Sequence, residues 1–458
     1  MGQTITRWEP ENEAFWNQAG KAVARRNLLV SIPALFLAFA VWMVWSVVTT
    51  RLNSVGFSFT TGQLFWLTAL PALSGATLRI FYSFLVPVFG GRRWTALSTA
   101  SLLFPALWMG VAVQDSTTPY WQFVLIALLC GLGGGNFASS MSNISFFYPK
   151  KKAGAALGLN AGFGNLGVSG MQFLVPMALG AGLFGTLAGA PATTAEGKTL
   201  WLQNAGFLWV VPVALVAVLA WFLMDDLATA KASVTDQLVI FRRKNTWIMS
   251  WIYLATFGSF IGYSAAFPML IKTQFPEINA LKLAFLGPLV GAVSRPVGGW
   301  VSDKLGGARV TLVNFVVMGA AVLGAIHFLP EGGQGGSFPG FFAMFLLLFF
   351  TTGIGNGSTF RMIPVMFRGF HEGNMPLGAS PSDRDQATRQ AGKESAAVIG
   401  FTSAIGAYGG FLIPLGFGSA LKATGSANGA LFSFLAFYAT CIVATWWWYA
   451  RKNAESPC

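Results

Sequence analysis

The sequence predicts an all-α polytopic membrane protein with twelve transmembrane helices, arranged as two six-helix pseudo-repeats. Hydrophobic residues make up 54% of the 458 residues and charged residues only 10%, whereas a soluble domain is about 25% charged. Apolar runs long enough to cross a bilayer, about 20 residues each, recur along the whole chain. A segment that joins an arginine to a Gly-Gly pair occurs once in each half. The short alternating segments of a β-barrel do not appear.

Each predicted helix is an apolar run bounded by polar segments. The runs are 29–50, 62–88, 94–113, 121–147, 153–182 and 203–224 in the first half, and 247–270, 283–302, 310–329, 340–366, 395–420 and 430–449 in the second. The predicted organisation is a cytoplasmic segment 1–28, a first bundle 29–224, a cytoplasmic linker 225–246, a second bundle 247–450 and a tail 451–458.

The net charge of +13 orients the chain in its membrane. Most basic loop residues fall on one predicted side, and the loops of the other side hold only Arg51, Lys198, Lys272, Lys282 and Lys422. Loops rich in Lys and Arg stay in the cytoplasm, so both termini are expected there. The partner that this charge implies is the lipid bilayer, with no need for nucleic acid. The three cysteines show no disulfide or metal spacing, and we expect neither a metal nor a cofactor.

The repeat places two arginines at matching depths. "RIFYSFLVPVFGGRRWT" begins at Arg79 and "RPVGGWVSDKLGGARVT" begins at Arg295. Each arginine stands eleven residues before the Gly-Gly pair of a predicted cytoplasmic loop, a helical distance of about 16 Å. Both therefore lie near the middle of a hydrocarbon core about 30 Å thick. A pseudo-two-fold axis between the halves would bring them face to face, where transporters bind their substrates.

The two arginines have no acidic partner in the predicted spans, because all sixteen Asp and Glu residues lie outside them. An arginine at this depth normally faces a cavity or a partner. We therefore predict that a substrate anion supplies the counter-charge. The alternative is a structural role, in which the side chain bonds to carbonyls or reaches the interface. We prefer that role for Arg361, close to the inner end of its span. A guanidinium fork suits nitrate, phosphate or carboxylate.

Aromatic and glycine residues characterise the predicted centre. Phe137 lies in "CGLGGGNFASSMSN", and Tyr253 and Phe257 lie in "YLATFGSFIGY". Aromatic faces favour a flat, weakly hydrated anion over a tetrahedral one, although such residues also serve for packing alone. The glycine-rich spans "GLNAGFGNLGVSG" and "GFTSAIGAYGGF" would let helices approach closely and slide.

One loop resembles a family motif. "GGWVSDKLGGAR" resembles the loop between the second and third helices of a half in the major facilitator superfamily. The resemblance implies a gating loop with Asp303 and Arg309, in which Asp303 pairs with a nearby cation. The first half carries Pro87 where the second carries Asp303, and we expect it to lack that contact.

The chain resembles the NarK/NarU-type nitrate/nitrite porters of that superfamily over nearly its whole length. The likeness runs from "RNLLVSIPALFLAFAVWM" through "NFASSMSNISFFYPK" and "DKLGGARVTLVNF" to "FTSAIGAYGGFLIP". It implies nitrate and nitrite as substrates, a monomer, and the bacterial inner membrane. The implied binding residues are Arg79 and Arg295 as clamps, Phe137 and Phe257 on either side of the anion, and Asn165 and Tyr253 as polar contacts. The implied glycine motifs contain Gly162, Gly164, Gly167, Gly406, Gly409 and Gly410.

The charge argument predicts nitrate/nitrite antiport by alternating access. An empty carrier would move two uncompensated charges through a low dielectric, so the loaded carrier should reorient faster. Proton-coupled nitrate uptake is the alternative, with His327, tyrosines or Glu394 as the titratable groups. A non-transporting anion sensor is a third possibility, but the segment 367–392 has no domain-sized core. We do not expect an enzyme, because no nucleophile–base pair or cofactor loop occurs.

Overall fold

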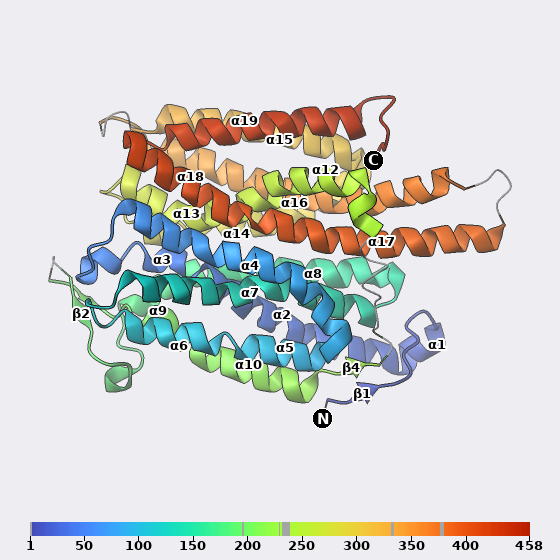
Figure 1. Cartoon of the computed structure of the whole chain (residues 1–458), viewed down its shortest axis with the longest axis horizontal. Coiled ribbons are helices and arrows are strands. Elements are labelled where there is room, and N and C mark those ends of the chain that lie inside the picture. The colour runs from blue at the N-terminus through green and yellow to red at the C-terminus, as the bar shows by residue number, and fades with distance from the viewer. Residues whose placement is uncertain (1, 195–196, 229, 231–238, 331–333, 376–379) are drawn as a thin grey trace.

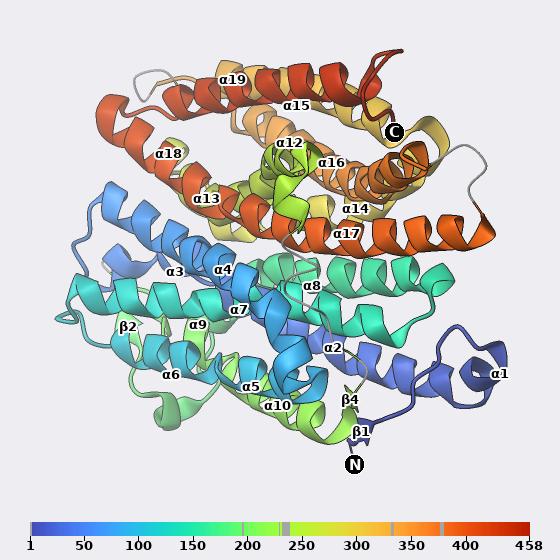
Figure 2. The ribbon, with the colours of Figure 1, turned by 45° about the vertical axis from the view of Figure 1, so that its right-hand side comes forward.

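The computed structural model describes the chain except residues 1, 195–196, 229, 231–238, 331–333 and 376–379. Its helices run side by side in two groups, one from each half of the sequence (Figures 1 and 2). The end of the bundle that carries α1 (Glu13–Phe15), the end of α16 (Phe338–Gly373) and the start of α17 (Pro381–Ala407) is called the terminal end here. The opposite end, which carries β2, is called the far end.

Among the described residues, the first half contains ten α-helices and three short strands, with short π and 3-10 segments between them. They are β1 (Thr4–Ile5), α1 (Glu13–Phe15), α2 (Lys21–Met43), α3 (Trp45–Val48), α4 (Thr61–Phe89), α5 (Gly91–Ala100), α6 (Leu103–Ala112), α7 (Tyr120–Phe147), α8 (Lys150–Leu179), β2 (Ala192–Thr193), β3 (Thr199–Leu200), α9 (Asn204–Phe207) and α10 (Val210–Leu223), with a π-helix at Trp16–Gly20 and a 3-10 turn at Leu52–Val55. Strand β4 (Asp226–Leu227) pairs with β1 in parallel, and β2 pairs with β3 in antiparallel.

The second half repeats this helical plan. Its helices are α12 (Lys244–Tyr253), α13 (Ser259–Gln274), α14 (Leu286–Leu305), α15 (Gly307–Phe328), α16 (Phe338–Gly373), α17 (Pro381–Ala407), α18 (Gly409–Thr424) and α19 (Asn428–Thr445), with π-helices at Leu254–Gly258 and Trp446–Ala450. The predicted linker 225–246 lies partly outside the described residues.

The helices agree with the predicted membrane spans. Within the described residues, eleven helical segments are long and apolar enough to cross a membrane. The remaining predicted span, 153–182, corresponds to the 30-residue helix α8, whose glycines and asparagines lower its hydropathy. Two spans are each divided into two helices four residues before a proline, at Ser101 before Pro105 and at Leu208 before Pro212. Proline clashes with the carbonyl group at that position and donates no hydrogen bond.

The internal repeat is visible in the backbone. Helices α4 and α14 both end at a glycine with φ of 87°, Gly90 and Gly306 respectively. This left-handed conformation favours glycine, and the next helix starts at once in both halves. A chain segment that follows the last helix of each half then covers this turn. The Asp226 carboxylate accepts from the Arg92 amide at 2.8 Å, and the Cys458 carbonyl accepts from the Ala308 amide at 3.0 Å.

The two halves are joined from the middle of the bundle to the far end. Helix α4 packs on α17 and α18, α8 on α14, and α3 on α13. At the far end, Lys272 donates to the Thr50 carbonyl. Gln172 Nε2 donates to the Ser264 carbonyl at 2.7 Å, still on the far side of the centre. The bonds nearest the middle join Arg79 to the Ser403 carbonyl at 3.1 Å and Thr77 to Tyr408 at 2.8 Å.

Candidate anion-binding site

Arg79 lies in the middle of α4 and is fully buried. Its Nε donates to the Gly134 carbonyl of α7 at 3.0 Å, within the first half. Its Nη1 donates to the Ser403 carbonyl of α17 at 3.1 Å, in the second half. Its Nη2 has no hydrogen-bond partner. Because backbone dipoles hold two of the three nitrogens, the remaining nitrogen is available for a ligand.

The close approach of α4 and α7 permits this arrangement. A Cβ atom added at Gly134 would stand 2.8 Å from the Cα of Gly75 and 2.7 Å from the Trp42 ring. Glycine is therefore required for α7 to pack this tightly on α4. The Trp42 indole, which donates to the Pro71 carbonyl at 2.7 Å, lies 5.3 Å from the Arg79 guanidinium.

Arg295 occupies the equivalent position on α14 and is also buried. Its guanidinium lies 4.8 Å from the ring centroid of Phe360, and its Nη1 has no partner. The Tyr253 hydroxyl is close to this guanidinium, but without the geometry of a hydrogen bond it too stays unpaired. Arg79 and Arg295 repel each other electrostatically, and the positive charge of each also interacts with the Tyr253 hydroxyl group. The two arginines therefore belong to one electrostatic site.

A series of aromatic rings connects the two arginines. The Arg79 guanidinium lies 4.8 Å from the Phe137 ring and 5.4 Å from the Phe257 ring. Phe257 stacks on Tyr253 with centroids 5.4 Å apart. Tyr253 in turn lies 5.7 Å from Phe360, the ring beside Arg295. Each end of the series thus carries a cation on an aromatic face.

Phe137 and Phe257 form two plates, one from each half of the molecule. Their centroids are 6.3 Å apart and their planes are inclined by 28°. A flat ion between two rings needs a contact of about 3.5 Å on each side, or about 7 Å in all. The centroid separation of 6.3 Å is just short of this value, so the two rings would have to move slightly apart to admit a planar anion between them.

Asn165, the remaining predicted contact, lies on α8 and is 1% exposed. Both polar atoms of its amide lack a partner. Helix α8 packs against α2, α7 and α14, the last of which carries Arg295. An unpaired buried polar group costs about 1–3 kcal/mol, and four of the six predicted binding residues each contain one. These residues are Arg79, Arg295, Tyr253 and Asn165.

In the described part of the chain, no carboxylate oxygen forms an ion pair with Arg79 or Arg295. Arg361 differs, because its Nε pairs with the Asp303 carboxylate and its side chain is 45% exposed. Asp303 of the predicted gating loop thus has Arg361 as its cationic partner. Arg309, the other residue of the predicted gating loop, is exposed. In the first half Asp226, from beyond the last helix, pairs with Arg92 at 3.3 Å.

A buried acid close to the terminal end was not anticipated in detail. The Glu394 carboxylate of α17 is 2% exposed and receives two bonds from Arg243, at 2.9 and 3.0 Å. His371 Nε2 lies 3.2 Å from the same carboxylate. The three residues lie on α17, on the segment before α12 and on α16. They are too far apart in the sequence for their spacing to predict that they meet.

The glycines of the second motif allow close packing against Tyr253, Phe257 and the segment that follows them. A Cβ atom at Gly406 would stand 2.8 Å from the Tyr253 ring and 3.2 Å from Phe257. One at Gly409 would meet the Gly258 backbone at 2.3 Å, and one at Gly410 would meet Ile261 at 2.6 Å. Tyr253 and Phe257 flank or belong to the π-helix Leu254–Gly258, a feature common at functional sites.

The first glycine motif packs mainly on α2. A Cβ atom at Gly167 would stand 2.1 Å from the Phe36 carbonyl oxygen, and one at Gly164 would stand 2.6 Å from the Leu35 side chain. Gly162 has no such neighbour within 4 Å. Gly164 and Gly167 thus permit close packing in this conformation, while Gly162 faces open space.

Two six-helix repeats with buried cations between them define a multi-pass membrane transporter, and the family comparisons agree. The model of the Major Facilitator Superfamily matches residues 30–375. The chain is 52% identical over 447 residues to the nitrate/nitrite transporter NarU of Escherichia coli strain K12, covering 97% of this chain and 96% of the relative. It is 42% identical over 466 residues to the probable nitrate/nitrite antiporter NarK2 of Thermus thermophilus, covering 100% and 99%. The chain belongs to the nitrate/nitrite porter family of this superfamily.

Solved structures support the fold. A crystal structure of a D-xylose-proton symporter superposes with a TM-score of 0.63 at 14% identity, covering 95% of this chain and 98% of that one. A bacterial homologue of the human lysosomal transporter Spinster, in an inward-facing and occupied conformation, superposes with a TM-score of 0.60 at 14% identity, covering 92% and 95%. At this identity the likeness concerns the fold alone.

Proposed function

We propose that this protein exchanges nitrate for nitrite across the bacterial inner membrane by alternating access, with the anion held between Arg79 and Arg295. The observation that carries the proposal is the pair of buried arginines with unpaired nitrogens and no acidic partner among the described residues. Phe137 and Phe257 would enclose the flat faces of the anion, and Asn165 and Tyr253 would bond to its oxygens. Each chain holds both arginines, which supports a monomer as the working unit.

The same geometry favours exchange over net transport. Without an anion, two buried positive charges would move with the site, and this is costly in a low dielectric. One bound monovalent anion compensates part of that charge. Moving one anion in each direction is also electroneutral, whereas a net charge would work against about 2.3 kcal/mol per 100 mV.

The basic segments at the terminal end, among them Lys150 at the start of α8, support a cytoplasmic location for this end. By the positive-inside rule, we propose that this end and both termini lie in the cytoplasm. The hydrogen bonds between the halves extend from Arg79 toward the far end. This distribution supports an inward-facing conformation, closed on the periplasmic side.

Proteoliposome flux tests the exchange mechanism. Purified protein should take up labelled nitrate into vesicles loaded with nitrite, and should do so equally with and without a pH gradient. Vesicles loaded with sulfate provide the control for leak. Uptake driven by a pH gradient into nitrite-free vesicles would overturn exchange.

Proton-coupled uptake is the second candidate, and the Glu394 cluster is the observation that favours it. A buried carboxylate beside a histidine is a proton site in principle. The two charge-assisted bonds from Arg243, however, favour the ionised carboxylate. Glu394→Gln should therefore leave nitrate/nitrite exchange independent of the pH gradient, as in the unmodified protein. Loss of a pH-driven component in this variant would support proton coupling instead.

A further inference from the structure

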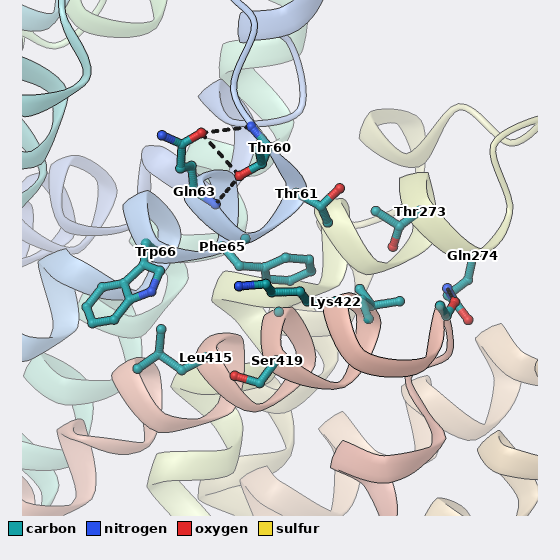
Figure 3. A pocket seen from close by; sticks show the side chains of 14 residues that line it. Thr60, Thr61, Gln63, Phe65, Trp66, Thr273, Gln274, Leu415, Ser419 and Lys422 are labelled. Atoms are coloured by element: carbon teal, nitrogen blue, oxygen red, sulfur yellow. Dashed lines mark hydrogen bonds between the residues drawn. The ribbon is translucent and has the colours of Figure 1, made fainter.

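A large groove opens at the far end of the bundle, on the seam between the two halves. It has a volume of about 820 Å³ and is lined by α4 with the residue before it, the end of α13, and α18 with the residue that follows it. Figure 3 shows its walls, with Thr60, Gln63 and Trp66 on one side and Leu415, Ser419 and Lys422 on the other. Trp66 is 13 residues from Arg79 along α4, about 20 Å. The groove is therefore separate from the anion site.

The lining of the groove changes from polar to apolar with depth. Thr60 and Thr61 lie at the start of α4, Gln274 at the end of α13, and Lys422 two residues before the end of α18. Leu415 lies seven residues deeper on α18, about 10 Å, and Trp66 lines the opposite wall. A polar rim above an apolar wall matches a ligand with a polar head and a hydrocarbon body.

The positive charge of Lys422 indicates that the head group of such a ligand is anionic. It is the one charged residue that lines the groove in the described part of the chain. Its ammonium group has no ion pair or hydrogen bond among the described residues, and its side chain is exposed. The hydroxyl groups of Thr61 and Ser419 also line the groove and can donate hydrogen bonds, whereas the Thr273 hydroxyl donates to the Leu270 carbonyl at 3.1 Å. This combination attracts an anionic oxygen-rich group.

The exposed apolar residues beside the groove indicate that the ligand comes from the bilayer. Trp66 is 46% exposed and Leu412 is 50% exposed. A water-filled vestibule would not favour the exposure of such large apolar side chains. The Trp66 ring contacts Phe411 of the other half, with centroids 5.8 Å apart. Tryptophan is enriched where membrane proteins meet the lipid head groups.

We propose that this groove binds an anionic glycerophospholipid, with its phosphate at Lys422 and one acyl chain along Trp66 and Leu415. Because α4 and α18 belong to different halves, such a lipid would bridge them at the far end. It would therefore favour the conformation in which these two helix ends have their present separation. The proposal does not depend on the identity of the transported anion.

Native mass spectrometry of delipidated protein tests the proposal. Phosphatidylglycerol should bind more tightly than phosphatidylcholine, and Lys422→Ala should weaken phosphatidylglycerol about fivefold, the value of one lysine near an anionic surface. Lys282→Ala is the matched control, because Lys282 is an exposed lysine at the same end outside the groove lining. Ser419→Trp should fill the groove and remove the preference while Lys422 remains.

Three results would overturn the proposal, and each differs from the expected one. Equal retention of both lipids, or equal effects of Lys422→Ala and Lys282→Ala, would show that the groove does not select an anionic lipid. Competition experiments with inorganic phosphate and glycerol phosphate separate the sources of the phosphate group. Full displacement of the lipid by millimolar amounts of either would identify a site for a soluble phosphate instead. Thermal unfolding in detergent verifies that each variant is folded.

Discussion

Arg79 shows how a single buried cation is stabilised without an acidic residue. Two backbone carbonyls accept from its guanidinium, and three aromatic rings lie within 5.4 Å of it. Each cation–π contact contributes about 0.5–2 kcal/mol. These groups reduce the cost of burial but leave the formal charge in place. An anion can therefore still be bound by electrostatic attraction.

Replacing either arginine by lysine tests this assignment. Arg79→Lys and Arg295→Lys keep the charge and lose the planar fork, so nitrate affinity should fall about 10- to 100-fold, the equivalent of one charge-assisted hydrogen bond. Labelled nitrate counterflow measures the effect. Arg361→Lys is the control, because its exposed pair with Asp303 should tolerate the change. Near-normal nitrate affinity in both central variants would contradict the clamp.

Asn165 offers a test that separates binding from folding. Asn165→Leu removes an amide with two unpaired buried atoms, so the anion-free protein should gain about 1–3 kcal/mol of stability while nitrate binds more weakly. The measurement is the melting temperature in detergent with and without nitrate. Asn204 is an equally buried asparagine whose amide donates to the Ala178 and Ala181 carbonyls. Asn204→Leu should destabilise the protein, and a stabilising effect there would undermine the argument.

At the scale of the helices, glycine determines how closely neighbouring elements approach. Gly167→Ala would place a Cβ atom 2.1 Å from the Phe36 carbonyl, so we expect about 1–3 kcal/mol of lost stability and slower exchange. Gly162→Ala meets nothing within 4 Å and should gain about 0.5–1 kcal/mol from the better helix former. Melting temperatures and counterflow rates compare the two variants. If both variants lost stability and exchange rate equally, Gly162 would have to pack closely in another conformation.

At the scale of the whole molecule, the bonds between the halves determine which end is closed. Gln172→Leu removes the bond to the Ser264 carbonyl and should shift the population toward a state open at the far end. Spin labels at Thr61 and Ala423, both exposed, should then show a longer distance population. Gln203→Leu is the control, because the bonds of Gln203 within the described residues go to carbonyls of its own half. An unchanged distance distribution in Gln172→Leu would argue against this bond as a latch.

The helical spans and the paired arginines could be predicted from sequence, because apolar length and internal repetition are local patterns. The placement of Arg79 beside Phe137 and Phe257 was accessible only through the family resemblance. The Ser403 carbonyl could not be foreseen, because backbone acceptors carry no sequence signature. The Arg243–Glu394–His371 cluster was missed for a related reason. Its members lie far apart in the chain, and only packing of the helices brings them together.

The π-helix Leu254–Gly258 has a consequence for any attempt to shorten or regularise this helix. A wide turn of this kind is equivalent to one extra residue inserted in a regular helix. Deleting one residue within it would restore ordinary winding and leave α12 and α13 at nearly their present relative rotation, whereas a deletion in a regular helix rotates the following segment by about 100°. Only the residues of the wide turn itself, Phe257 among them, would then face in a different direction. This irregular turn thus confines the effect of such a deletion to the aromatic residues of the anion site, while the packing of both flanking helices is retained.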